Sequence, residues 1–282
     1  MEIIRASDMG FCFGVRRAVE MAERAAAELG ELSSLGSVVH NRQVVEHLAA
    51  LGVSVVRNPA DARGRAIIIP SHGVAPEVMV EAGGLGLRVI DATCPMVTRS
   101  QQWAKRLSRD GFTVIIFGNP DHPEVRGVLG WAQGKGLAFP DGNALHSVLL
   151  PSRIAVLSQT TQTEERFASF VGSLLDFHLK GVREMRVINT LCNATTSKQA
   201  ATRELARKVD LMIVVGGRES ANTRHLTEVA EAEGVETHQV EEAAQIDAAW
   251  LRGRARIGLT AGASTPNEAI DTVAARLQEL AG

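Results

Sequence analysis

Three cysteines, each followed by a polar residue at one fixed distance, place the strongest constraint on how this chain can fold. The three pairs, each separated by 28 residues, are Cys12 and His40, Cys94 and His122, and Cys192 and Ser220. Each interval has the pattern of a helix followed by an apolar strand, with the polar residue at the end of that strand. A fixed interval of this kind indicates one supersecondary unit that is used three times.

A comparison of the chain with itself supports this repetition. The segment Val89–Thr98 aligns with Val187–Thr196, and both contain a strand, an Asp or Asn, a cysteine and the start of a helix. Repeated strand–loop–helix units are common in α/β proteins, which accounts for the similar elements. It does not account for the joint recurrence of the cysteine and the interval.

Short β-branched segments alternate with amphipathic segments along the chain, which predicts an α/β fold with mostly parallel strands. The predicted strands are Ser37–His40, Ala66–Ser71, Arg88–Ala92, Thr113–Gly118, Ile154–Ser158, Arg186–Asn189, Leu211–Gly216 and Arg256–Ala261. The predicted helices include Val15–Leu29, Val44–Ala50, Met96–Arg109, Thr163–Phe177, Thr195–Lys208, Thr223–Glu233 and Pro266–Leu280. Apolar residues recur in these helices at spacings of three and four.

Composition excludes several classes of protein. The formal net charge is −2 and the basic residues are scattered, so nucleic acid is not expected as a main partner. No apolar stretch approaches the ~18–20 residues that span a bilayer, and the N-terminus lacks a signal-peptide pattern. We therefore expect a cytoplasmic protein with reduced thiols and no membrane partner. An odd number of widely spaced cysteines argues against a disulfide framework.

The cysteines are candidate ligands of a metal or a cluster. Each lies just before a predicted helix, where the helix dipole favours a thiolate. A single such cysteine is more often a small buried apolar residue. Three in matched contexts favour joint ligation of zinc or an iron–sulfur cluster, and they are one fewer than a closed four-cysteine site. The chain has no Cys-x-x-Cys motif, which zinc sites commonly contain.

Polar residues at the predicted strand ends form a candidate anion site, because donors at helix N-termini bind phosphate and diphosphate groups. They lie in His40-Asn41, Ser71-His72-Gly73, Asp121–Glu124, Thr160-Thr161, Ser220–Asn222 and Ser264–Pro266. For each Ser, Thr or Asn, simple helix capping is the alternative. Glu124 follows Pro123 in a first helical turn, where an acidic residue commonly complements the dipole. Near a thiolate-bound iron, the same Glu124 could deliver protons.

The chain resembles the 4-hydroxy-3-methylbut-2-enyl diphosphate reductase family. The matching segments, in order along nearly the whole chain, are Gly10–Val15, Val39–Asn41, Ser71–Val74, Asp91–Pro95, His122–Val125, Ser158–Thr161, Cys192–Thr196, Ser220–Thr223 and Thr260–Ser264. The resemblance implies three similar α/β domains in a pseudo-threefold arrangement around a central cluster. Its expected units are residues 13–94, residues 95–188, and residues 189–282 together with 1–12.

The resemblance also implies the site and the chemistry. Cys12, Cys94 and Cys192 are expected to hold a [4Fe–4S] cluster whose fourth iron is open to the substrate hydroxyl. The residues expected to bind the diphosphate are His40, His72, His122, Ser220, Asn222 and Ser264. Thr160 is expected near the substrate hydroxyl, and Glu124 is expected to be the proton source. Glu124, Thr160 and His122 are the expected catalytic residues. The implied products are isopentenyl and dimethylallyl diphosphate, and the implied electron donor is ferredoxin or flavodoxin.

One segment departs from the family pattern. Glu219-Ser-Ala-Asn222 stands where the family often has Asn-Ser-Ser-Asn. Ala221 cannot donate a side-chain hydrogen bond, so a backbone N–H is the expected substitute. Glu219 adds a negative charge beside an anion site unless it points away or pairs with Arg218 or Arg224.

Two other functions are weighed against this one. A thiolate-bound zinc or cluster protein that acts as a sensor would keep the cysteines but would not need Glu124 or the diphosphate residues. A metal-free phosphosugar or nucleotide enzyme with structural cysteines would need a glycine-rich phosphate loop. Neither G-x-G-x-x-G nor G-x-x-x-x-G-K-[ST] is present in a strand-to-helix context.

Overall fold

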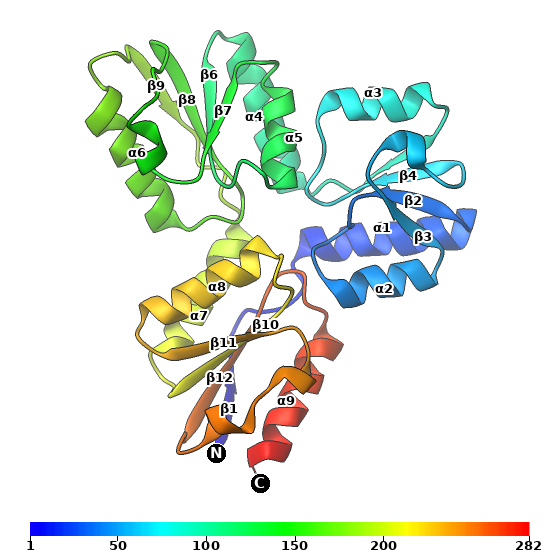
Figure 1. Ribbon diagram of the computed structural model, residues 1–282, viewed down its shortest axis with the longest axis vertical. Coiled ribbons are helices and arrows are strands. Elements are labelled where there is room, and N and C mark those ends of the chain that lie inside the picture. Colours follow the sequence, from blue (N-terminus) through cyan, green and yellow to red (C-terminus); the bar gives the residue numbers. More distant parts are fainter. Residues whose placement is uncertain (282) are drawn as a thin grey trace. The chain divides into compact units, whose positions relative to one another are not determined.

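The computed structural model describes residues 1–281, and within them every strand pairing is parallel. Three four-stranded sheets are formed (Figure 1). In spatial order, the first contains β3 (Val53–Val56), β2 (Leu32–Leu35), β4 (Ala66–Ile69) and β5 (Arg88–Asp91). The second contains β7 (Gly136–Phe139), β6 (Thr113–Phe117), β8 (Arg153–Ser158) and β9 (Glu184–Val187). The third contains β11 (Glu236–Val240), β10 (Leu211–Val215), β12 (Arg256–Ala261) and β1 (Glu2–Arg5).

α-Helices connect these strands, except that only 3₁₀ turns lie between β3 and β4, between β7 and β8, and between β11 and β12. The α-helices are α1 (Phe13–Leu29), α2 (Arg42–Ala50), α3 (Pro76–Gly84), α4 (Pro95–Arg109), α5 (Pro123–Trp131), α6 (Glu164–His178), α7 (Asn193–Ala206), α8 (Ala221–Ala232) and α9 (Asn267–Ala281). Short 3₁₀ turns occur at Pro59–Asp61, Asn143–Leu145, Ala243–Gln245 and Ala248–Leu251. None of the helices in the described part of the chain is long and apolar enough to cross a membrane.

The three sheets share one topology, which confirms the α/β class and the repetition expected from the sequence. Across each sheet, the strands of the repeat lie in the order second, first, third, fourth, so the second strand is at one edge and the fourth is at the other. The N-terminal strand β1 takes the place in the third sheet that β5 and β9 take in the other two. One topology used three times explains why the cysteine-to-polar interval is constant.

The chain forms two compact units. The first contains Met1–Arg16, Val39–Glu46 and the residues from Asn193 onward, and it holds the third sheet. The second contains Arg17–Val38 and His47–Cys192, and it holds the first and second sheets. The three-unit boundaries expected from the sequence, 13–94, 95–188 and 189–282 with 1–12, stay a prediction.

Apolar cores cover both faces of the second and third sheets. In the first unit, Leu211, Ile213 and Leu259 pack with α9, whereas Met212 on the opposite face packs with Leu205 of α7. In the second unit, one face of the sheet that contains β6 packs on α4 and α5, and the other packs on α6. Because both faces are covered, the central strands of these two sheets are nearly or wholly buried, as the continuous apolar stretches predict.

Several predicted elements differ from the structure. The strand predicted at Ser37–His40 is wrong: the strand is β2, and residues 38–40 form bends after it. Strands β1, β3, β7 and β11 and helix α3 were not predicted. All four of these strands lie at sheet edges, where partial exposure weakens the apolar pattern.

Candidate functional site

The three cysteines lie in equivalent loops. Each follows the last strand of its sheet (β1, β5 or β9) and directly precedes a helix (α1, α4 or α7). All three are half-buried thiols. In the first loop, the Val15 N–H donates to Cys12 Sγ at 3.5 Å. Backbone N–H groups at a helix start favour the thiolate form, which is the form that binds metals.

One backbone hydrogen bond anchors each cysteine in the same way. The donor and acceptor pairs are Cys12 N–H to Ala263 O at 3.1 Å, Cys94 N–H to Ser71 O at 2.9 Å, and Cys192 N–H to Thr160 O at 3.0 Å. Each acceptor lies two residues beyond the neighbouring strand, which is β12, β4 or β8. The three thiols are therefore held at equivalent positions beyond the carboxyl edges of parallel sheets, where α/β proteins bind ligands.

Within the described residues, no group of three or more His, Cys, Asp or Glu side chains could hold a single metal ion. An iron–sulfur cluster makes a different demand, because each cysteine binds a different iron atom. The donors present suit such a cluster: soft sulfur ligands, half-buried, each at a helix N-terminus.

In the second unit, Glu124 lies in the first turn of α5 with 3% of its surface exposed. The Thr160 backbone N–H donates to Glu124 Oε1 at 2.7 Å, and the Thr160 hydroxyl donates to Oε2 at 2.8 Å. Burial raises the pKa of Glu124 to about 7, while the two Thr160 hydrogen bonds act in the opposite direction. This carboxyl group can therefore both hold and release a proton at neutral pH.

Two histidines of the second unit have assignable ring roles. His122 occupies the N-cap position of α5, and its Nδ1 accepts from the Glu124 N–H at 3.1 Å. An accepting Nδ1 places the proton of a neutral ring on Nε2, which makes Nε2 a donor. His72 is buried, and its Nδ1 lies 3.0 Å from the Gly73 carbonyl, which can only accept. His72 therefore carries a proton on Nδ1.

In the first unit, the start of α8 carries a buried side chain whose polar atoms are unsatisfied within the described part of the chain. Ser220 caps this helix and accepts from the Thr223 N–H at 3.3 Å. Asn222 is buried, and neither its side-chain nitrogen nor its oxygen has a hydrogen-bond partner among the described residues. Buried polar groups are nearly always bonded, so an unsatisfied carboxamide at a helix N-terminus indicates a place for a polar ligand.

His40 and Ser264 lie in the same unit as this helix start. The Ser264 hydroxyl donates to the His40 carbonyl at 3.2 Å. Burial lowers the pKa of His40, and the nearby Glu219 carboxylate partly opposes this shift. A Cβ at Gly217 would lie 2.9 Å from the His40 carbonyl, so glycine lets the loop after β10 approach His40 closely.

The departure at Glu219 and Ala221 takes a clear form in the structure. Ala221 is the first residue of α8, so its backbone N–H lies among the N–H groups that an α-helix leaves without an internal acceptor. The Glu219 charge acts on His40. Thr223, which was not predicted, has a buried Oγ1 without a hydrogen-bond partner among the described residues. Its position three residues after Ser220, in the first turn of the helix that Ser220 caps, was the feature of the sequence that could have indicated it.

The sequence-predicted residues thus fall into two sets. The second unit holds Cys94, Cys192, His72, His122, Glu124 and Thr160, and the first holds Cys12, His40, Ser220, Asn222 and Ser264. Within the second set, direct hydrogen bonds join Glu124 to Thr160 and His122.

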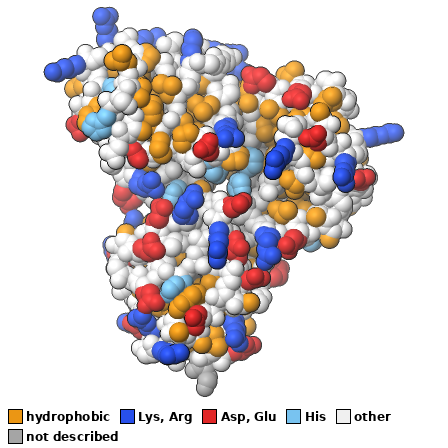
Figure 2. Space-filling view, viewed as in Figure 1, with side chains coloured by type: hydrophobic (Ala, Val, Ile, Leu, Met, Phe, Trp, Pro, Cys, Tyr) orange, Lys and Arg blue, Asp and Glu red, His pale blue; other side chains and the backbone are white. Residues whose placement is uncertain are grey.

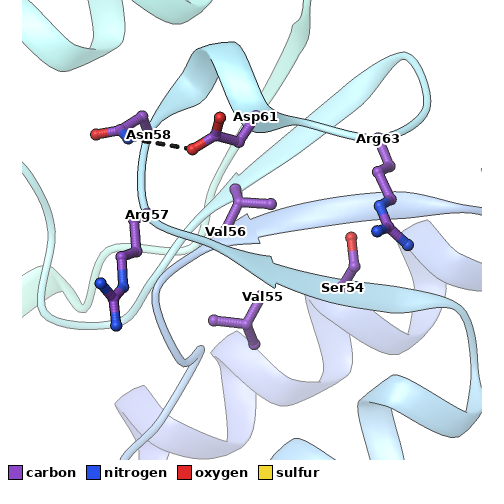
Figure 3. A pocket seen from close by; sticks show the side chains of 7 residues that line it. All are labelled: Ser54, Val55, Val56, Arg57, Asn58, Asp61 and Arg63. Atoms are coloured by element: carbon purple, nitrogen blue, oxygen red, sulfur yellow. Dashed lines mark hydrogen bonds between the residues drawn. The ribbon is translucent and has the colours of Figure 1, made fainter.

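A surface cavity of about 510 Å³ is lined by residues of β3 and the following turn (Figure 3). It contains none of the predicted site residues. Arg57 and Arg63 are exposed, and Asn58 Nδ2 donates to Asp61 at 3.1 Å across the turn. On the face shown in Figure 2, Lys and Arg side chains are interspersed with Asp and Glu side chains. The cavity lacks a buried titratable group of the kind that Glu124 provides.

Fold and site together define an α/β protein of parallel sheets with a cysteine loop beyond each sheet. The chain belongs to the LytB protein family, whose sequence profile matches residues 3–278. It is similar to the 4-hydroxy-3-methylbut-2-enyl diphosphate reductase of Dehalococcoides mccartyi strain CBDB1, with 46% identity over 99% of both chains. The Geobacter sulfurreducens protein of the same name is 43% identical over 99% of this chain and 98% of its own.

Solved structures agree with this assignment. One is the structure of (E)-4-hydroxy-3-methyl-but-2-enyl diphosphate reductase, the terminal enzyme of the non-mevalonate pathway. It shares 38% identity over 99% of this chain and 100% of its own, with a TM-score of 0.70. The E-1-hydroxy-2-methyl-but-2-enyl-4-diphosphate reductase of Plasmodium falciparum has a TM-score of 0.92 at 25% identity, over 98% of this chain and 88% of its own. The family resemblance seen in the sequence is confirmed.

Proposed function

We propose that this chain removes the allylic hydroxyl of (E)-4-hydroxy-3-methylbut-2-enyl diphosphate by reduction, and that it forms isopentenyl and dimethylallyl diphosphate. Relatives that match along nearly their whole length carry the name of this reductase. The observation that carries the proposal is the identical backbone anchor of three cysteines in three equivalent loops. The repeated topology explains the backbone anchor, and the recurrence of a half-buried cysteine at this one position favours a shared ligand of the three thiols.

Cys12, Cys94 and Cys192 are proposed to hold a [4Fe–4S] cluster with one iron that has no protein ligand. When bound, the cluster supplies electrons and a Lewis acid for the substrate hydroxyl. The proposal requires the three thiolates to act as one ligand set. Hydroxide is a poor leaving group, so the remaining chemistry must deliver a proton to it.

Glu124 is proposed to be that proton source. Its pKa of about 7 keeps a large fraction protonated at neutral pH, and burial protects the proton from bulk water. Thr160 orients both carboxyl oxygens and is proposed to lie near the substrate hydroxyl, with His122 capping the same helix. Two electrons and two protons balance the reaction. One proton leaves in water, and the other is added to either end of the allyl group to give the two products.

The diphosphate is proposed to bind the polar residues at the strand ends. These residues are His40, His72, His122, Ser220, Asn222 and Ser264. The unsatisfied carboxamide of Asn222 and the N-terminus of α8 support an anion at this position. Binding of the non-reacting diphosphate holds the carbon skeleton in place during the reduction.

Ferredoxin or flavodoxin is proposed as the electron donor, because the reaction takes up two electrons and the chain has no dinucleotide-binding motif. A chemical reductant can replace this partner in a test. The proposed place of the reaction is the last step of the non-mevalonate isoprenoid pathway.

The test uses full-length protein purified without oxygen. We expect iron and sulfide to be bound, and the allylic diphosphate to be converted to both products when a chemical reductant is present. A colourless protein with stoichiometric zinc and no turnover would instead support a zinc sensor.

A matched pair of variants then assigns the proton. Glu124→Gln should keep substrate affinity but lower turnover by about 10²-fold or more. Glu77→Gln is the control, since Glu77 also follows a proline in a first helical turn but is exposed. Equal turnover in the two variants would assign the proton to another group.

A further inference from the structure

A basic side chain from the helix after one cysteine reaches the loop before the next cysteine, and this occurs three times. Arg17 lies five residues after Cys12, Arg99 five after Cys94, and Lys198 six after Cys192. The contacts are Arg17 Nη1 to the Thr93 carbonyl at 3.1 Å, Arg99 Nη2 to the Asn189 carbonyl at 3.5 Å, and Lys198 Nζ to the Asp8 carboxylate. The acceptors lie one, three and four residues before Cys94, Cys192 and Cys12, respectively.

The pair of Lys198 and Asp8 is the most deeply placed of the three. The Lys198 side chain is 3% exposed, and the Asp8 side chain is 37% exposed. The hydrogen bonds of Asp8 to Lys198 and Ser197 lower the pKa of this carboxyl group against the opposing effect of its burial. A buried ammonium group is costly to desolvate, and its removal from a carboxylate leaves an uncompensated charge. The pair therefore fixes Asp8 on α7.

Apolar contacts hold the same loop on the same helix. Ala6 and Met9 pack in one cluster with Ala201 and Leu205 of α7. Asp8 lies between these two apolar residues in the sequence, and Lys198 lies one turn before Ala201 on the helix. The segment that leads to Cys12 is therefore attached to α7 by an ion pair and by packing.

The loops before Cys94 and Cys192 each contain a turn that stabilises them independently of the basic side chain. Asp91 accepts from the Thr93 N–H and Asn189 accepts from the Leu191 N–H, both at 3.0 Å. These Asx turns fix the backbone whose carbonyl groups then bind Arg17 and Arg99. The loop before Cys12 has no Asp or Asn three residues before its cysteine, and its Asp8 binds the lysine directly. The basic contact should therefore matter most for Cys12.

We infer that Arg17, Arg99 and Lys198 are positioning residues, each of which fixes the loop of the next cysteine in a cyclic order. The helix after Cys12 fixes Cys94, the helix after Cys94 fixes Cys192, and the helix after Cys192 fixes Cys12. Only the identity of the ligand that the cysteines bind rests on the proposed function; the effect on the loops does not.

Hydrogen exchange of the three cysteine N–H groups in the full-length chain tests this inference, because each donates the anchoring bond described above. Lys198→Met should speed exchange at Cys12 about tenfold, the factor for a loss of about 1.4 kcal/mol, and leave Cys94 and Cys192 unchanged. Arg17→Met should act on Cys94 alone. Arg99→Met should act on Cys192 alone and more weakly, since its contact is longer and exposed.

Three controls separate positioning from general loosening. Lys198→Arg should restore slow exchange, because it keeps the charge. Lys208→Met removes an exposed ion pair between the turn that follows α7 and Glu204 of α7, and it should leave all three amides unchanged. Asp8→Asn should repeat the effect of Lys198→Met if that variant folds poorly. Faster exchange at all three cysteines, or at none, would overturn the inference.

A second readout links the loops to the cofactor. Iron release from anaerobically reconstituted protein to a chelator should be faster in Lys198→Met than in the wild type and in Lys198→Arg. Wild-type protein that binds no iron would reject the proposed function and leave the exchange result standing. Wild-type protein that binds iron, with release unchanged in Lys198→Met and exchange unchanged at Cys12, would reject the inference alone.

Discussion

At the scale of single residues, burial sets the chemistry of Glu124. Its carboxyl group has two donors from Thr160, which would ordinarily favour ionisation, yet its pKa is raised to about 7. Desolvation therefore outweighs two short hydrogen bonds. An acid that is half protonated at neutral pH suits a reaction that consumes protons.

The raised pKa of Glu124 predicts how stability depends on pH. The folded state binds this proton more tightly than the unfolded state, so Glu124 lowers stability as pH rises from about 4.5 to about 7. The predicted loss is about 3 kcal/mol, with no further change above pH 7. Glu124→Gln cannot ionise and should lose this dependence. Denaturant unfolding at several pH values measures the difference, and parallel curves for the two proteins would contradict it.

Substitution of Asn222 should affect substrate affinity but not the free energy of unfolding. Asn222→Ala removes a buried carboxamide that has no partner among the described residues, so the free energy of unfolding should be nearly unchanged. Affinity for the diphosphate substrate should fall about tenfold, as expected for the loss of a hydrogen bond to a charged group. Asn41→Ala is the control for stability. Asn41 is also buried before a helix, but it caps α2 at 3.1 Å, and its loss should cost about 1 kcal/mol. A loss of stability in Asn222→Ala equal to that of the control would reject the ligand role.

At the scale of elements, the sequence predicted what burial makes regular. Strands β6, β8, β10 and β12 are nearly or wholly buried and were located within a residue at either end. Strand β2 was misplaced because Leu32–Leu35 includes two serines, whereas Val38 and Val39 supply β-branched residues in a bend. The hydroxyl groups of these buried serines are satisfied by hydrogen bonds, such as the one between Ser33 Oγ and Ser54 Oγ at 3.1 Å. A search for apolar residues does not detect buried serines.

The turn before β4 offers a test of element placement. A Cβ at Gly64 would lie 2.1 Å from the Glu31 carbonyl oxygen, at a φ of +76°. Gly86 has nearly the same φ of +74°, but a Cβ there meets no atom within 4 Å. Gly86→Ala should cost about 1–2 kcal/mol from backbone strain alone. Gly64→Ala should cost clearly more, because the chain before β2 or β4 must shift. The urea midpoints of the two variants measure these losses of stability. Equal losses would show that the contact with the Glu31 carbonyl adds nothing to the backbone strain.

At the scale of the whole molecule, the repeat decides which site residues the sequence could reveal. Strands β2, β6 and β10 are equivalent in the three sheets, and the residue five positions after each of them is His40, His122 or Ser220. Two positions further on, the equivalent residues are Arg42, Glu124 and Asn222. The constant interval therefore pointed to real structural equivalents. The carbonyl groups that anchor the cysteines could not be predicted, because a backbone acceptor leaves no trace in residue type. The basic contacts of Arg17 and Lys198 were also hidden, since their positions differ by one residue within the repeat.

Structural equivalence predicts that the three cysteines have equal weight in cofactor binding. Each cysteine has the same backbone anchor and the same position before a helix, so none of the three loops is dispensable on structural grounds. Cys12→Ser, Cys94→Ser and Cys192→Ser should each abolish retention of the proposed cluster, because a cluster held by only three thiolates cannot lose one of them. Iron and sulfide per chain after anaerobic reconstitution measure this. The free energy of unfolding of the cluster-free variants should stay near that of the cluster-free wild type, which separates lost ligation from lost folding. Full iron content in any one variant would reject joint ligation by the three thiolates.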